Sequence, residues 1–269
     1  MTNLNGGTLF NAEFGIRHRA APYRKGQVLH SVFAAAAVYL WALMNSKLFL
    51  YYALMTSSIF GCEREAVQKS DIEQFPVIPL ESLHEKNLDL LRELLVKVES
   101  RQLDAKDIDS IVNAIYRLAP ADVVLVEDRL ATALPFSQVK RFAVSPPSEK
   151  EVERYLESLE KILKPFDFSE QPLELAAVPQ SPLSPWRFIR IGGPATGHLP
   201  KASDLLATLN MADGLGCTLV EFHEEGAMYL GVLNQRRYWT RTAARTFALD
   251  LIKRNDEILN RVTRSAVAT

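Results

Sequence analysis

The apolar positions of the first 163 residues recur every three or four residues, which is the spacing of helices that bury one face. The pattern predicts a buried helix that starts at Ser31, its candidate N-cap, and a second helix from residue 47 to about residue 56. Four amphipathic helices are predicted farther on, at residues 85–99, 107–118, 121–132 and 149–163. Asp104 or Asp107 is the candidate cap of the second of these four. This part of the chain is therefore expected to be helical.

Beyond residue 185 the apolar period changes from that of a helix to that of a strand. Residues 164–185 contain five prolines, which predicts a linker or a domain boundary. Strands are predicted at residues 186–191, 217–222 and 227–233, the last two as a hairpin with Gly226 in its turn. A final helix is predicted from about residue 240 to residue 265. The chain is expected to have an α+β fold, mainly helical at first and ending in a small strand–hairpin–helix unit.

These breaks divide the chain into a first segment (1–80), a helical connector (81–163), the proline-rich linker (164–185) and a small α+β domain (186–269). The uncharged run at residues 32–44 is shorter than the about 20 residues that a bilayer-spanning helix needs. Lys47 would lie near the bilayer centre if the span were extended past this run. We therefore expect a buried helix and no membrane contact, with a membrane-associated accessory protein as the weaker alternative.

The composition is that of an ordinary globular protein rather than of a simple nucleic-acid-binding domain. The chain has 269 residues, of which 48% are hydrophobic and 23% charged, and its formal net charge is -1. An autonomous nucleic-acid-binding domain is usually strongly basic. The charge is uneven, however, because both ends are basic and residues 81–130 are acidic. This distribution is compatible with a nucleic-acid contact by part of the surface, and equally with plain solvated helix faces.

Two cysteines, Cys62 and Cys217, lie far apart in the sequence, and neither belongs to a Cys-x-x-Cys or Cys/His cluster. This pattern favours a reducing, cytoplasmic setting and gives no structural zinc site. The N-terminus has no basic segment followed by an apolar core, so no signal peptide is predicted. A cytoplasmic protein is therefore expected.

Residues 45–80 carry a recurrent signature. In order they contain Asn45-Ser46, Tyr51-Tyr52, Thr56-Ser57-Ser58, Phe60-Gly61-Cys62-Glu63-Arg64, Asp71 and Phe75-Pro76. This string resembles the target-recognition region near the C-terminus of adenine-specific (N-6) DNA methyltransferases from restriction-modification and related anti-phage systems, with Phe60 in place of the more usual tryptophan. Residues 115–130 are similar to the stretch that follows in that family. The resemblance covers about half of the chain and makes residues 1–80 a target-recognition-like segment.

The resemblance implies recognition without catalysis. An adenine methyltransferase needs an Asn/Asp-Pro-Pro-Tyr/Phe motif to grip the flipped adenine, and Ser145-Pro146-Pro147-Ser148 lacks both the amide or carboxylate and the aromatic ring. Gly192-Gly193 lacks the spacing of a cofactor-binding loop. Because Met1 starts the chain before any methyltransferase domain, we expect either a fragment or a subunit whose catalytic partner uses S-adenosylmethionine. No cofactor is expected in this chain.

The remaining acidic and histidine residues give no self-contained catalytic or metal site. Glu221, Glu224 and Glu225 flank the predicted hairpin without the lysine that metal nucleases place beside their acidic ligands. The five histidines show no pairing at three or four residues. We therefore expect neither catalytic residues nor metal ligands in this chain.

The candidate DNA contacts are two basic strips, because arginine binds phosphate and reads guanine. The first strip consists of Arg17, His18, Arg19, Arg24 and Lys25, and the second of Arg236, Arg237, Arg241 and Arg245. Four residues of the signature are expected to be structural, with an internal ion pair between the last two: Asn45, Gly61, Glu63 and Arg64.

Two functions follow from these expectations. The first is a non-catalytic subunit that binds double-stranded DNA and acts with a separate catalytic methyltransferase subunit. The second is an assembly subunit of a bacterial defence complex that contacts another defence-system protein and no DNA.

Overall fold

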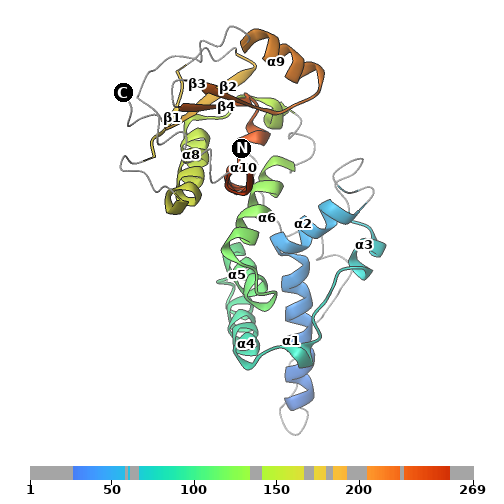
Figure 1. Cartoon of the computed structure of the whole chain (residues 1–269). Coiled ribbons are helices and arrows are strands. Elements are labelled where there is room, and N and C mark those ends of the chain that lie inside the picture. The colour runs from blue at the N-terminus through green and yellow to red at the C-terminus, as the bar shows by residue number, and fades with distance from the viewer. Residues whose placement is uncertain are drawn as a thin grey trace.

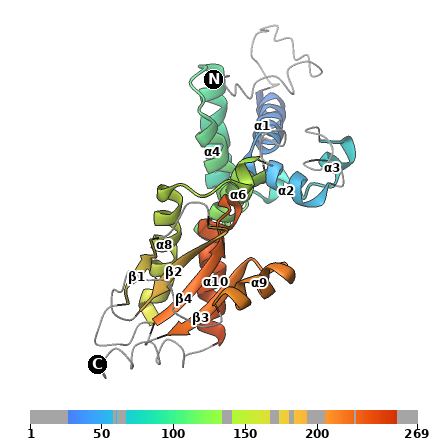
Figure 2. The same ribbon diagram turned by 90° about the horizontal axis from the view of Figure 1, so that it is seen from above.

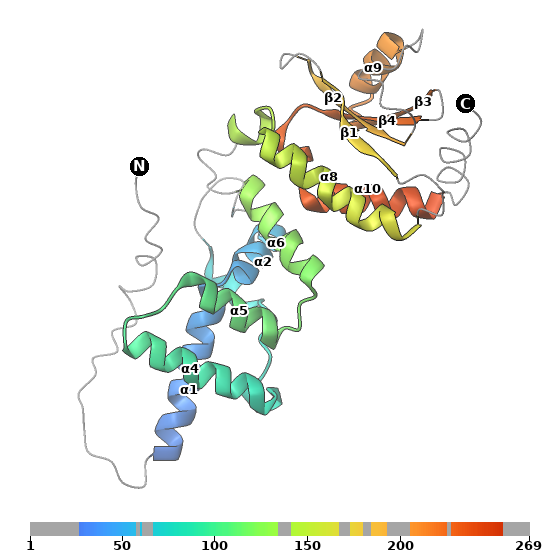
Figure 3. The ribbon, with the colours of Figure 1, turned by 90° about the vertical axis from the view of Figure 1, so that its left-hand side faces the viewer.

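The computed structural model describes residues 27–57, 60, 67–133, 141–166, 173–179, 184–192, 205–224 and 227–254 (Figure 1). These residues form an all-helical unit followed by a unit in which three helices pack on a four-stranded antiparallel sheet. Figure 3 shows helix α6 at the end of the helical unit nearest the second unit. The α+β fold with a mainly helical N-terminal part, predicted from the apolar spacing, is thus confirmed.

The helical unit contains α1 (Gln27–Met44), α2 (Lys47–Thr56), α3 (Lys69–Glu73), the 3₁₀ turn η1 (Leu80–Ser82), α4 (Glu85–Glu99), α5 (Ala105–Ile115) and α6 (Pro120–Ala133). Side-chain caps begin several of these helices, as for α2, where the hydroxyl of Ser46 accepts the N–H of Phe49. Asp104 caps α5, as one of the two predicted alternatives. Ser31 is not an N-cap, because α1 already includes residues 27–30, which contain no glycine or proline to end a helix.

The core of the helical unit is built from α1, α2, α4 and α5 around the inserted ring of Phe75. This ring lies 5.4 Å from that of Phe49, 4.9 Å from that of Tyr52 and 5.9 Å from that of Tyr116, measured between centroids. Tilted and edge-on aromatic contacts of this kind add to the free energy gained from burial. Among the residues that the structure describes, no helix has both the length and the apolar character needed to cross a bilayer.

The second unit contains α8 (Glu149–Leu163), η2 (Lys164–Phe166), β1 (Leu175–Ala177), β2 (Trp186–Ile191), α9 (Leu205–Gly214), β3 (Leu219–Glu224), β4 (Ala227–Leu233), η3 (Arg236–Tyr238) and α10 (Arg241–Arg254). The strands run in the order β1-β2-β4-β3, and each pairs antiparallel with its neighbours (Figure 2). Helices α8 and α10 cover one face of the sheet and α9 covers the other.

The two faces of the sheet follow from strict alternation along the strands. Ile189 and Leu230 point into the cluster with α8 and α10, whereas Phe188 and Tyr229 point toward α9. Both faces are apolar because both are covered by helices. The sheet is therefore the central layer of three.

The structure departs from the predicted boundaries at three places. Residues 164–185, predicted as a linker, contribute the strand β1, which pairs with β2. Helix α8, predicted as part of the connector, packs against α10 and the sheet. Helix α9 lies in a segment for which no helix was predicted. The change in packing between the two units falls at α6, before the proline-rich segment, because the apolar face of α8 is needed to cover the sheet.

Candidate nucleic-acid interface

The two units meet where α6 contacts the first turn of α10. Arg241 donates from Nη2 to Asp128 at 2.9 Å and to Glu127 at 3.1 Å, and its Nε lies 3.1 Å from Asp128. The other oxygen of Asp128 accepts the backbone N–H of Thr242 at 2.8 Å and the hydroxyl of Thr242 at 2.9 Å. The carboxylate of Asp128 is largely buried, with 12% of the side chain exposed. One acidic side chain thus joins the helical unit to the start of α10.

A second cation extends this network into the helical unit. The ammonium of Lys47 lies 3.2 Å from Asp109 and 3.5 Å from Glu127, and the backbone N–H of Lys47 donates to Asp109 at 2.8 Å. Burial opposes ionisation of Glu127, but the hydrogen bond from Arg241 and the charge of Lys47 outweigh it and lower the pKa of this carboxyl. Alternating charges therefore link α2, α5, α6 and α10.

Arg236 fixes the turn η3 to the start of α8. Its guanidinium forms an ion pair with Glu151 and lies 4.7 Å above the ring of Phe142, while its backbone N–H donates to the carbonyl of Ser145 at 2.8 Å. Burial raises the pKa of Glu151, but hydrogen bonds from Ser148 and Arg236 outweigh this effect, so the pKa is lowered overall. Arg236 is consequently engaged inside the fold.

The predicted strip Arg236, Arg237, Arg241 and Arg245 is therefore split in two. Arg236 and Arg241 are tied to carboxylates, whereas Arg237 and Arg245 are exposed and form no ion pair within the described residues. The guanidinium of Arg237 donates from Nε to Gln235 at 3.0 Å and lies 4.8 Å from the ring centroid of Tyr238. Arg245 lies one helical turn after Arg241.

Two further arginines at the junction were not singled out in the sequence. Arg129 follows Asp128 on α6, and Arg141 precedes Phe142, over which Arg236 is stacked. Both are exposed and lack an ion pair in the part of the chain that the structure describes. No local motif marks either residue, because each becomes notable only through the contacts of its sequence neighbour.

The other predicted site residues fall in two groups. Asn45 follows α1, and its side-chain amide donates to the carbonyl of Trp41 at 2.8 Å, which is a structural contact. The rest lie outside the described residues, so their roles stay predictions: Arg17, His18, Arg19, Arg24, Lys25, Gly61, Glu63 and Arg64. Within the described ranges, no three histidine, cysteine or acidic side chains gather where they could hold a metal ion.

Comparisons with family models, with curated proteins and with solved structures give no match to this chain.

Proposed function

We propose that the chain is a non-catalytic DNA-recognition subunit that acts in the cytoplasm beside a separate adenine methyltransferase subunit. The observation that carries this proposal is the charge imbalance at the junction between the two units. The carboxylates of Glu127 and Asp128 share the guanidinium of Arg241, and the carboxylate of Glu151 pairs with Arg236. Four arginines close in sequence to these contacts, Arg129, Arg141, Arg237 and Arg245, are exposed and have no acidic partner among the described residues. The positive charges of these arginines are complementary to a polyanion such as duplex DNA, which presents a regular row of phosphates.

We propose that arginine side chains, rather than the backbone N–H groups of a helix terminus, contact the DNA. The N-terminus of an uncapped helix offers free N–H groups to a phosphate. At the start of α10, however, Asp128 already accepts the N–H of Thr242 and brings a negative charge to that end of the helix. A phosphate is therefore expected to bind the exposed guanidinium groups around the junction, which have no such competing acid among the described residues.

The resemblance of residues 45–80 to target-recognition regions supports the same function and assigns these residues a supporting part. Ser46, Phe49 and Phe75 are buried in the helical core. Buried residues of this kind hold the scaffold and leave direct contact with DNA to exposed cations. The catalytic step then belongs to the partner subunit, with which this chain would share a DNA site.

Fluorescence anisotropy with a labelled DNA duplex tests the proposal. The complete chain is expected to bind, and the logarithm of its affinity should fall linearly with the logarithm of salt between about 50 and 200 mM. The double variant Arg237→Glu/Arg245→Glu should weaken binding to all sequences alike and reduce the salt slope by about two. The matched control, Lys86→Glu/Lys161→Glu, makes the same charge change at exposed lysines of α4 and α8 and should leave binding unchanged. Absence of salt-sensitive binding by the unaltered chain, alone and with a candidate methyltransferase subunit, would refute the proposal.

A second function, assembly of a defence complex without DNA contact, is favoured by one observation. Among the side chains of α1 and α2 whose burial the structure describes, three large apolar ones are exposed: Leu40 (45%), Trp41 (36%) and Met55 (53%). Exposed aromatic and aliphatic side chains are frequent in protein interfaces. The double variant Leu40→Ser/Trp41→Ser should abolish co-purification with a partner protein if this surface is used, and should leave DNA binding at the junction intact.

A further inference from the structure

The segment that precedes α8 carries an exposed aromatic ring. Phe142 is 59% exposed, although phenylalanine is usually buried. Its backbone carbonyl accepts the N–H of Ser145 at 3.3 Å and the hydroxyl of Ser145 at 2.7 Å. The carbonyl of Ser145 in turn accepts the N–H of Arg236, at the start of η3, at 2.8 Å. The ring therefore projects from a backbone segment that is hydrogen-bonded to the second unit.

One face of this ring is covered by a cation that is itself held in place. The guanidinium of Arg236 lies 4.7 Å from the ring centroid of Phe142 and pairs with Glu151. The other oxygen of Glu151 accepts the N–H and the hydroxyl of Ser148 at 2.9 and 2.8 Å. Glu151 thus fixes the guanidinium, and the guanidinium lies against one face of the ring. Because the ring is still mostly exposed, its opposite face is open to a planar ligand.

The charge around the ring is positive. Six cations outnumber three carboxylates over residues 141–154, residues 236–237 and Arg187. Two of the carboxylates are already paired with arginines, Glu149 with Arg187 and Glu151 with Arg236. Arg141 and Arg237 are exposed and have no acidic partner in the described part of the chain. These two arginines are therefore available to an anionic ligand.

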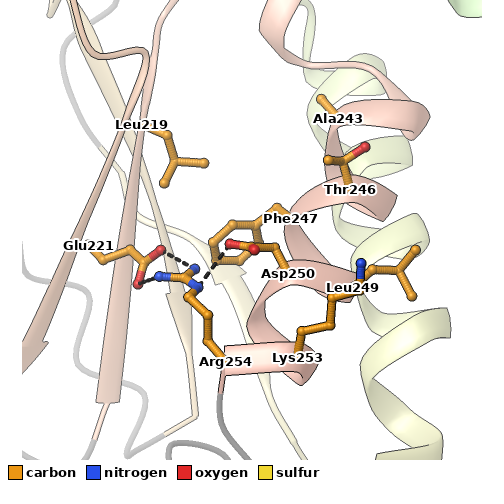
Figure 4. A pocket seen from close by; sticks show the side chains of 9 residues that line it. All are labelled: Leu219, Glu221, Ala243, Thr246, Phe247, Leu249, Asp250, Lys253 and Arg254. Atoms are coloured by element: carbon orange, nitrogen blue, oxygen red, sulfur yellow. Dashed lines mark hydrogen bonds and ion pairs between the residues drawn. The ribbon is translucent and has the colours of Figure 1, made fainter.

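The groove between β3 and α10 differs from this surface in its charge (Figure 4). Its volume is about 630 Å³, and the charges of its four ionised side chains sum to zero: Glu221, Asp250, Lys253 and Arg254. Arg254 donates to the two oxygens of Glu221 at 2.6 and 3.2 Å and pairs with Asp250 at 2.8 Å. A neutral groove offers a polyanion no net attraction. We therefore expect DNA at the ring rather than in the groove.

A nucleotide matches both features of the surface around Phe142. A base stacks on an aromatic ring, and the phosphates beside the base pair with arginines. An apolar segment of a protein would gain from the ring alone and would leave Arg141 and Arg237 without a partner. The combination of an open ring and unpaired cations thus favours a nucleic-acid strand with an unstacked base.

We infer that Phe142 stacks on an unpaired base of DNA, while Arg141 and Arg237 bind the phosphates beside it. This inference rests on the proposed function, because these arginines are two of the four that we propose to bind duplex DNA. It specifies the ligand as DNA in which a single-stranded segment adjoins the duplex. The stacked base can be any of the four, since each has an aromatic face.

Two DNAs with equal numbers of phosphates test the inference on the complete chain by fluorescence anisotropy. Each consists of the same duplex with a single-stranded overhang of about five nucleotides, which carries thymine bases in the first DNA and abasic sites in the second. The DNA with bases should bind about tenfold more tightly, because the stacking of one base on an aromatic side chain has an effect of this order. Equal affinities would overturn the inference, whereas salt-sensitive binding of the duplex without an overhang would still support the proposed function. Absence of binding to all three DNAs would refute both.

Variants of Phe142 test whether this ring is the stacking site. Phe142→Leu keeps an apolar side chain but removes the aromatic face, so it should bind the thymine overhang about tenfold more weakly and the plain duplex unchanged. Phe142→Tyr keeps the aromatic face and should bind as the original chain does. The matched control Phe166→Leu alters a phenylalanine, 40% exposed, beyond the opposite end of α8 and should have no effect. If Phe142→Leu retained the preference for thymine over abasic sites, Phe142 would not be the stacking site and the inference would be overturned.

Discussion

The carboxylate of Asp128, on α6, accepts the backbone N–H of Thr242 in the first turn of α10 at 2.8 Å, although the two residues are 114 positions apart in the chain. This is the bond that an N-cap residue makes, but the acid comes from a different helix and a different unit. The same carboxylate binds Arg241 through its second oxygen. Asp128 therefore couples the start of α10 to the orientation of the helical unit.

Replacement of Asp128 is expected to destabilise the protein. Asp128→Asn keeps the shape but removes the charge that pairs with Arg241 and favours the helix N-terminus, so a loss of about 1–2 kcal/mol in the free energy of unfolding is expected. Chemical denaturation measures this loss. The control Asp213→Asn, at an exposed position of α9, should change stability little. Equal stability of the two variants would show that the contact between α6 and α10 contributes nothing to folding.

The two arginines one turn apart on α10 are expected to behave differently when truncated. Arg241→Ala leaves Glu127 and Asp128 without their shared cation and should lower the unfolding free energy by about 1–3 kcal/mol. Arg245→Ala removes an exposed side chain with no ion pair in the described residues and should leave stability within about 0.5 kcal/mol of the original. Anisotropy with a DNA duplex, measured on the same two variants, tests whether Arg241 stabilises the fold and Arg245 binds DNA. Arg245→Ala should weaken DNA binding while the fold stays intact.

Stability is expected to fall in acid because two junction carboxyls ionise more readily in the fold. The pKa values of Glu127 and Glu151 lie below their ordinary value of 4.5, because hydrogen bonds and cations outweigh the effect of burial. As the pH drops, the unfolded chain binds protons first, so this contribution is complete above about pH 4.5 and is lost as the pH falls through the folded-state pKa values. Glu127→Gln/Glu151→Gln should flatten the pH dependence of the unfolding free energy in that range. An unchanged slope would show that other groups cause the acid sensitivity.

The elements with strong internal periodicity could be predicted from the sequence. The predicted helices at 85–99 and 149–163 have the bounds of α4 and α8, and the predicted strands at 186–191 and 227–233 have those of β2 and β4. Each of these elements has a regularly spaced apolar face, which can be recognised from the sequence of that element alone. β1 was missed because a segment of three residues between prolines is too short to show alternation. This segment is a strand because it pairs with β2.

The state of each arginine could not be predicted, because it depends on contacts between distant segments. In the sequence, Arg236 and Arg237 are equivalent neighbours, yet Arg236 pairs with Glu151, 85 residues away, and Arg237 is exposed. Arg241 and Arg245 differ in the same way, because only the former meets Asp128. The charge pattern in the sequence therefore identified the basic strip, but it could not show which of its arginines are held in ion pairs and which are exposed.

Gly231 in the middle of β4 provides a direct test of the packing between the sheet and α9. A Cβ atom at this position would lie 2.6 Å from Cγ2 of Val220 and 2.8 Å from Cε1 of Phe188, both in neighbouring strands. Because these contacts are shorter than van der Waals distance and both neighbours belong to the packed face, Gly231→Ala should destabilise the protein by about 1–3 kcal/mol. Thermal or chemical unfolding measures this effect, and Gly214→Ala, where a Cβ meets nothing within 4 Å, is the matched control. The additional variant Gly231→Ala/Val220→Ala removes the nearest obstructing methyl groups and should recover part of the loss relative to Val220→Ala alone. If Gly231→Ala were as stable as the original chain, β2 and β3 could not be packed against β4 as closely as they are in this fold.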